Sequence, residues 1–195
     1  MRRFRSVLAI TLLLTILTLS GCRAADDAMQ QALRMRTALL TAGSCTFQAD
    51  ISASYDDVRY DFSLDCTCDT DGAATMTVTA PQTLAGIAAS IQGTQADVTY
   101  DDTSIAFGLL AGGHLAPMQL PQLLTQALSG DYIRAAGSDH DTLRVTYLHG
   151  YDDEELVVDV WFSAACLPQY AEVTYDGQTL LTAAITNFVL ADATS

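Results

Sequence analysis

Apolar and polar residues alternate along residues 45–68, with one break at Asp56-Asp57. The apolar positions are odd-numbered before the break and even-numbered after it. A period of two places successive side chains on opposite faces of a strand. The pattern therefore predicts two antiparallel strands, each with one apolar face that other elements must cover. This requirement favours an α+β fold.

The same alternation continues through most of the chain after residue 68. Asp71-Gly72 and Asp176-Gly177 are hairpin signals, because both residues tolerate the positive φ angles of tight turns. In chain order, the further strand candidates are residues 74–79, Gly86–Gln92, Ala96–Tyr100, Ser104–Phe107, Tyr132–Ala136, Thr142–Tyr147, Glu155–Phe162, Gln169–Tyr175 and Gln178–Val189. We expect one antiparallel meander of about ten strands.

Two segments have helical spacing instead. Residues 26–41 begin with Asp26 and Asp27, which favour a helix N-terminus. Their expected apolar stripe comprises Met29, Ala32, Leu33, Met35, Leu39 and Leu40. A second helix is expected at about 119–128, with Pro121 in its first turn. An apolar loop, Gly108–Met118, precedes it.

The N-terminus has the features of a lipoprotein leader. Three arginines within residues 1–5 precede an uncharged apolar run, Val7–Leu19, that is too short for a relaxed membrane-spanning helix. The run ends in Leu19-Ser20-Gly21-Cys22, which resembles the bacterial lipobox. We expect a signal peptide at 1–21, acylation of Cys22 with palmitate-type chains, and a single mature domain at 22–195. The expected location is the extracytoplasmic side of the cell membrane; the alternatives are an ordinary signal peptide cut nearby or an uncleaved anchor.

The charge balance restricts the partners. The chain has 23 acidic and 9 basic residues, all of the latter arginine, and a formal net charge of −14. Nucleic acid is not expected as a partner, because phosphate binding needs clustered Lys and Arg. Removal of the leader leaves a mature charge of about −17, so acyl chains rather than a basic patch would hold the domain at a membrane.

The order of these elements resembles the LolA/LolB-like lipoprotein carrier superfamily, which includes LppX/LprG-like lipid-binding lipoproteins and a clostridial germination lipoprotein. Local resemblances are Ala80-Pro81 followed by Gly86-Ile87, and Leu167-Pro168 before the final strand ending in Asn187-Phe188. The resemblance covers Asp26 to about Leu190. It implies a strongly curved sheet, an incomplete β-barrel, plugged by the N-terminal and mid-chain helices.

The resemblance also implies an apolar cavity that takes acyl chains. The expected lipid-binding residues are Phe47, Ile51, Tyr60, Phe62, Leu64, Met76, Val78, Ile87, Ile91, Phe107, Leu124, Val145 and Val158. Gly112 and Gly113 are expected to hinge a lid that carries Leu109 and Leu110. For these residues the alternative is an ordinary packed core, and for the loop it is a buried connector. The superfamily's carrier has a buried arginine that contacts its helices, and Arg59, Arg134 and Arg144 are its candidates here.

Four cysteines remain after Cys22. A two-residue turn at Asp56-Asp57 places Cys45 opposite Cys68, whereas a slip of two residues would pair Cys45 with Cys66. Outside the cytoplasm we expect the disulfides Cys45–Cys68 and Cys66–Cys166. Buried thiols are the alternative if the cell lacks oxidative folding. A three-thiolate metal site is disfavoured, because zinc pairs usually have wider spacing.

Motifs of catalysis are missing from the sequence. It has no G-x-S-x-G, no P-loop and no H-E-x-x-H. We therefore expect a protein that is not an enzyme and needs no cofactor or metal. Its expected role is to bind or carry a lipid or other apolar ligand. The alternative is a non-catalytic scaffold or activator of a cell-envelope or spore-cortex enzyme, with a closed core.

Overall fold

The structure is a computed structural model that describes residues 26–55, 58–93, 95–100, 103–108, 117–140, 142–150 and 155–191. The leader, Cys22 and the four expected lid and hinge residues, Leu109, Leu110, Gly112 and Gly113, lie outside these ranges. Within the described ranges, no helix is both long and apolar enough to cross a membrane.

The described part of the chain contains one antiparallel sheet of eleven strands, close to the predicted ten. The strands are β1 (Ser44–Tyr55), β2 (Val58–Asp69), β3 (Ala73–Ala80), β4 (Ala88–Gln92), β5 (Gln95–Tyr100), β6 (Thr103–Gly108), β7 (Tyr132–Asp139), β8 (Thr142–His149), β9 (Leu156–Phe162), β10 (Pro168–Tyr175) and β11 (Gln178–Leu190). Their order across the sheet is β6-β5-β4-β3-β2-β1-β11-β10-β9-β8-β7. The sheet is open, because β6 and β7 lie at its opposite edges. The predicted α+β class and the unclosed curved sheet are confirmed.

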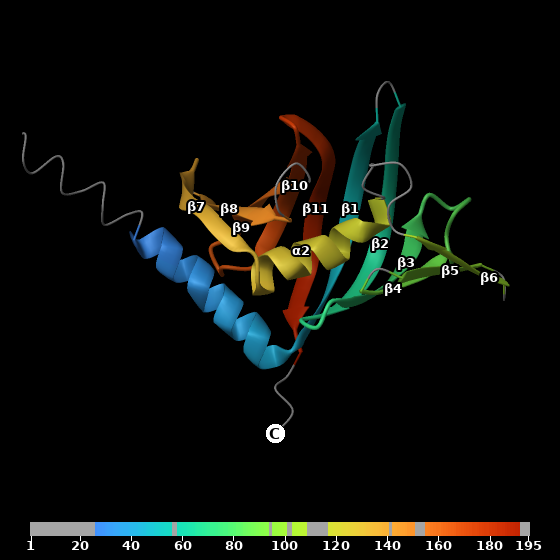
Figure 1. The fold of residues 1–195 in the computed structure, drawn as a ribbon, viewed down its shortest axis with the longest axis horizontal. Coiled ribbons are helices and arrows are strands. Elements are labelled where there is room, and N and C mark those ends of the chain that lie inside the picture. Colours follow the sequence, from blue (N-terminus) through green and yellow to red (C-terminus); the bar gives the residue numbers. More distant parts are fainter. Residues whose placement is uncertain are drawn as a thin grey trace, which may run out of the picture.

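This order consists of two meanders joined at the middle. The first runs outward from β1 to β6, and the second runs from β7 back to β11, which pairs with β1. The chain must therefore pass from one edge of the sheet to the other between β6 and β7. The helix α2 (Leu120–Ser129) lies on this connection and crosses the sheet in front of β11, β1 and β2 (Figure 1).

The hairpin predictions are confirmed where the structure describes them. Strands β1 and β2 pair without interruption from Tyr55 opposite Val58 to Ser44 opposite Asp69. Asp176 and Gly177 join β10 to β11 with φ angles of 48° and 75°, the left-handed backbone that this dipeptide tolerates. The alternation also gives the expected result, because the apolar positions of β1, β2 and β3 lie on one face of the sheet.

We call this apolar face, covered by the two helices, the inner face, and the opposite face the outer face. The N-terminal helix (residues 26–42) packs against the core through a stripe of four residues: Ala28, Ala32, Met35 and Leu39. The predicted stripe was too wide, since Leu33 is 40% exposed and Leu40 is 52% exposed. A short 3₁₀ turn, η1 (Pro117–Gln119), precedes α2, and Pro121 lies in the first turn of α2 as predicted.

Candidate functional site

The inner face of the sheet contains most of the residues expected to contact lipid. Nine of them have exposures of 0 to 6%: Phe47, Ile51, Leu64, Met76, Val78, Ile91, Leu124, Val145 and Val158. All nine belong to one continuous core that spans both meanders and both helices. The structure therefore brings these residues together beneath the helices, in a core that is closed in this conformation.

Four predicted residues are placed differently. Phe62 and Ile87 are partly buried and pack against the edge of the core. Tyr60 is 53% exposed, so it lies outside the buried set, and its role as a lipid-binding residue stays a prediction. The cause of this exposure is its position on the sheet: β2 pairs with β3 only from Ser63 onward, which leaves Tyr60 with a neighbouring strand on one side. Phe107 lies in β6, and its side chain is outside the described part of the structure.

The N-terminal half of α2 is fastened to the sheet by a polar side chain that the sequence analysis missed. The Gln122 amide donates hydrogen bonds to the carbonyls of Gly72, at 2.7 Å, and Gly93, at 3.3 Å. These glycines lie in the β2–β3 and β4–β5 turns. Because Gln122 is only 7% exposed, its bonds are shielded from water. We call this contact the Gln122 clasp.

Replacing Gln122 with alanine should lower the free energy of unfolding by about 1.5 kcal/mol, because the buried Gly72 carbonyl loses its donor. Gln30→Ala, at an exposed glutamine of the N-terminal helix, should change it by less than about 0.5 kcal/mol. Urea denaturation followed by circular dichroism measures both. Equal effects of the two substitutions would show that the clasp contributes nothing specific.

The C-terminal end of α2 is held by Arg36 of the N-terminal helix. Arg36 Nε donates to the Leu128 carbonyl at 3.0 Å, and Nη2 donates to the carbonyls of Ala127 at 3.2 Å and Asp131 at 2.6 Å. The last carbonyls of a helix have no partner within the helix, and α2 has no basic residue in its last turn. The guanidinium therefore supplies both the missing donors and the charge that a helix C-terminus favours. We call this contact the Arg36 clasp.

None of the arginines considered from the sequence makes this contact. Arg59 instead pairs with Asp61 across 2.9 Å, with both side chains exposed. Arg144 forms a bidentate ion pair with Asp159, and its hydrogen bonds to that carboxylate raise the pKa of the guanidinium. Arg134 is also exposed, on the edge strand β7. Within the described ranges, the arginine whose side chain hydrogen-bonds α2 is Arg36.

The two clasps and the side chains between them determine how α2 is attached to the rest of the fold. Polar contacts hold α2 near both ends. The other buried side chains of α2 are mainly apolar, namely Leu120, Leu123, Leu124, Ala127 and Leu128, and they are joined by Thr125, whose hydroxyl lies 3.9 Å from the Cys45 sulfur. Release of the clasps would free a helix whose buried side is mainly apolar, above a sheet face that is also apolar. An acyl chain could replace the apolar side chains of α2 on that face, while the Thr125 hydroxyl keeps its hydrogen bond to the Pro121 carbonyl of the same helix.

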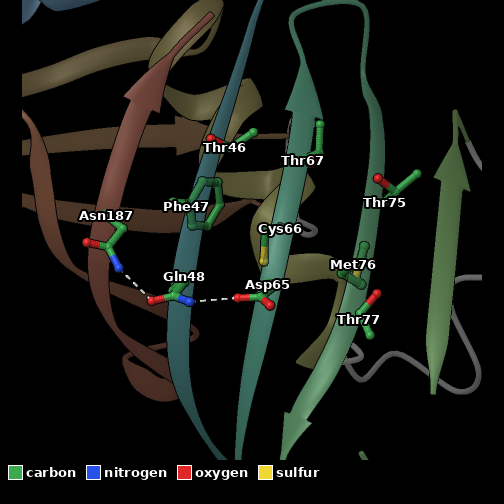
Figure 2. A pocket seen from close by; sticks show the side chains of 10 residues that line it. All are labelled: Thr46, Phe47, Gln48, Asp65, Cys66, Thr67, Thr75, Met76, Thr77 and Asn187. Atoms are coloured by element: carbon green, nitrogen blue, oxygen red, sulfur yellow. Dashed lines mark hydrogen bonds between the residues drawn. The ribbon is translucent and has the colours of Figure 1, made fainter. Parts of the chain in front are cut away.

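The outer face has a different chemistry. An open depression of about 370 Å³ lies over β11, β1, β2 and β3 (Figure 2). The polar side chains that line it are Thr46, Gln48, Asp65, Thr67, Thr75, Thr77 and Asn187. Asn187 donates to Gln48 at 2.7 Å, and Gln48 donates to Asp65 at 2.9 Å. A surface of hydroxyls, amides and a carboxylate suits water or polar ligands, and it does not suit an acyl chain.

A second polar cluster lies on the outer face of β7 to β10 and surrounds Trp161. The Trp161 indole donates to Asp139 at 2.9 Å and thereby lowers the pKa of that carboxyl. The Arg144 guanidinium lies 4.9 Å from the Trp161 ring centre, and the ring of Tyr170 lies 5.4 Å from it. These contacts fix the orientation of a partly exposed tryptophan.

The cysteines lie mainly under α2. The predicted register is confirmed, since Cys45 lies directly opposite Cys68. Cys45, Cys68 and Cys66 are buried, Cys166 is half-buried, and all four are free thiols. Burial raises the pKa of Cys45 to about 11 and that of Cys68 to about 12, and it also raises the pKa of Cys66. The structure does not bring Cys66 near Cys166, whose thiol instead donates to Gln31 of the N-terminal helix. The described residues include no cluster of His, Cys, Asp and Glu that could hold a metal ion.

Comparisons with known proteins find similar solved structures but no similar sequence. No family model matches the sequence, and no curated protein is similar to it in sequence. A putative outer membrane lipoprotein-sorting protein domain from Vibrio parahaemolyticus is similar in structure, with a TM-score of 0.48, 9% identity and coverage of 88% of this chain and 95% of that one. A LolA superfamily protein from Nitrosomonas europaea has a TM-score of 0.44, 12% identity and coverage of 80% and 93%.

A member of the superfamily named in the sequence analysis is thus among the solved structures that are similar to this chain. The lipoprotein LppX from Mycobacterium tuberculosis is also similar in structure, with a TM-score of 0.42, 15% identity and coverage of 85% of this chain and 97% of that one. At these identities the likeness concerns the fold.

Proposed function

We propose that this protein is a membrane-anchored, extracytoplasmic lipoprotein that binds or carries a lipid or another apolar ligand on the inner face of its sheet. The observation that carries the proposal is the composition of that face. It is apolar across both meanders, from Ala89 and Ile91 in β4 to Val145 and Tyr147 in β8. An extended apolar face beneath two helices suits a long, flexible acyl chain.

Binding in this proposal depends on movement of α2. The Gln122 and Arg36 clasps hold α2 against the inner face in the conformation described above. When they release, the apolar sides of α2 and of the sheet enclose the ligand. Each methylene removed from water then contributes about 0.8 kcal/mol. The proposed work is binding alone, with no covalent bond made or broken in the ligand.

The anchor in this proposal is Cys22, four residues before the helix that begins at residue 26. Two acyl chains on Cys22 would tether the domain stably, where one chain would give marginal binding. The short connection would keep the N-terminal helix, and therefore the Arg36 clasp, close to the bilayer. Lipid could then enter beneath α2 from the membrane that holds the anchor.

The test is native mass spectrometry of the full lipoprotein extracted from its own membranes in mild detergent. We expect a copurifying lipid on the wild-type protein. Ala127→Leu should reduce its occupancy, since Ala127 is fully buried between α2 and the sheet and a larger side chain fills that space. Ala38→Leu, on the exposed side of the N-terminal helix, should leave occupancy unchanged. Absence of lipid, or equal lipid occupancy in both variants, would refute the proposal. Circular dichroism checks that each variant is folded, because overpacking a core costs about 1–3 kcal/mol of stability.

A second candidate function rests on the closure of the core. Nine predicted lipid contacts are at most 6% exposed, so in this conformation the inner face is filled by the protein's own side chains. We infer from this the alternative role of a scaffold that binds an envelope protein. The oriented Trp161, with Arg144 and Tyr170 beside it, would be its contact surface, because such residues dominate binding energy at interfaces. Recovery of one stoichiometric protein partner, lost in Trp161→Ala, from a lipid-free preparation would favour this role.

A further inference from the structure

Three buried cysteines gather at one place on the inner face, where β1 and β2 pass under α2. Cys45 comes from β1, and Cys66 and Cys68 come from β2. The Thr125 hydroxyl of α2 lies 3.9 Å from the Cys45 sulfur. All three side chains pack in the hydrophobic core, and the proposed binding of lipid gives their thiol groups no role.

The strand register selects one pair among the three. Cys45 and Cys68 are directly opposite residues, and in antiparallel strands such residues have Cα atoms about 4.5 or 5.5 Å apart. Both values fall within the range of about 4.4–6.8 Å that a disulfide needs. Cys66 is diagonal to Cys45, at about 7–8 Å, and is two residues from Cys68 on the same strand. The geometry therefore favours Cys45–Cys68 over either pair that includes Cys66.

Cys166 is excluded as a partner by the order of the strands. It lies between β9 and β10, and two strands, β11 and β1, separate β10 from β2. Three spacings of about 4.8 Å along the sheet greatly exceed the reach of a disulfide. The contact of Cys166 with Gln31 also places it beneath the N-terminal helix, away from the thiols under α2.

We propose that Cys45 and Cys68 form a disulfide in the extracytoplasmic protein, and that Cys66 and Cys166 remain thiols. This inference rests on the location proposed above and is independent of the ligand. In the reaction the two thiols lose two protons and two electrons to a disulfide donor, which is reduced to two thiols. One S–S bond forms between β1 and β2, and one breaks in the donor.

Burial determines when this bond would form. The thiolate is the attacking species in disulfide exchange, and the pKa values of about 11 and about 12 leave very little of it in the folded protein at neutral pH. The α2 helix also covers the pair through Thr125. The bond would therefore form during folding, before α2 docks, and would afterwards be shielded from small reductants.

The experiment counts thiols in the full lipoprotein extracted from its membranes. The protein is unfolded in denaturant with an alkylating reagent, without reductant, and its intact mass is measured. We expect two alkylated cysteines without reductant and four after reduction, with Cys22 protected by its thioether. Peptide mapping should show Cys66 and Cys166 as the alkylated residues in the unreduced protein.

Cysteine variants provide the matched controls. Cys66→Ala and Cys166→Ala should each keep the bond and lose one alkylated residue, whereas Cys68→Ala should leave Cys45 alkylated. Four alkylated cysteines in the unreduced wild-type protein, or a bond that contains Cys66 or Cys166, would overturn the inference. Refolding of the reduced chain with oxidised glutathione tests the geometry apart from the cell. If the Cys45–Cys68 bond forms there but not in the membrane-derived protein, the geometry is sound, and the inference fails because the protein does not meet oxidative folding in its cell. Lipid occupancy is tested separately.

Discussion

Arg36→Ala is expected to lower the free energy of unfolding by about 3 kcal/mol, because hydrogen bonds to charged groups contribute about 1.5–3 kcal/mol each and act here on a helix C-terminus. The substitution leaves the carbonyls of Ala127 and Leu128 without donors. It also removes the cation from above the Tyr147 ring, whose centre is 5.9 Å from the guanidinium carbon. Urea denaturation at neutral pH measures the change.

Two further substitutions show whether the effect belongs to the clasp. Arg34→Ala removes the same charge from the exposed side of the same helix, and it should change the stability by less than about 0.5 kcal/mol. Arg36→Lys keeps the charge but loses the fork of donors, so it should restore only part of the stability. If Arg34→Ala and Arg36→Ala have equal effects, net charge rather than the clasp explains the result.

Leu39→Ala is expected to destabilise the protein by about 3 kcal/mol, within the range of about 2–5 kcal/mol for leucine truncation in a core. Leu39 has an exposure of 0% and packs the end of the N-terminal helix against the sheet. Its loss leaves a cavity between the helix and the inner face, and the surrounding strands can close this cavity only in part. Thermal and urea unfolding followed by circular dichroism measure the change.

The neighbouring residue is the matched control. Leu40 has the same chemistry and the same helix, but it is 52% exposed. Leu40→Ala should therefore change the stability by less than about 0.5 kcal/mol. Similar losses for Leu39→Ala and Leu40→Ala would mean that the helix packs with a different face, and the described position of the N-terminal helix would be wrong.

The sheet was predictable because its signals are local and repeat. A period of two, broken at Asp56-Asp57, determines both which face of β1 and β2 is buried and which residues are opposite each other. The register places Cys45 opposite Cys68 for the same reason. Asp176-Gly177 was predictable as a turn from its tolerance of positive φ.

The contacts that hold the helices were not predictable in this way. Arg36 reaches residues more than ninety positions away in the chain. Helical spacing places Arg36 closer to the buried stripe than Arg34, but no local pattern identifies the carbonyls that it contacts. Gln122 looks like a surface residue of α2 in the sequence, yet it is buried against two turns. Helical spacing placed Leu33 and Leu40 on the apolar stripe, but the width of a stripe depends on the surface that it meets, which only the tertiary structure defines.

The central claim is that the inner face beneath α2 receives acyl chains. Intermolecular nuclear Overhauser effects between a ¹³C-labelled fatty acid and the methyl groups of the full lipoprotein in micelles test it most directly. We predict contacts with the methyl groups of Ile51, Leu124 and Val158, which are at most 2% exposed on or against the inner face, and none with Val189, which is 58% exposed. Contacts with Val189 alone, or no contact with any of the three buried residues, would contradict the account.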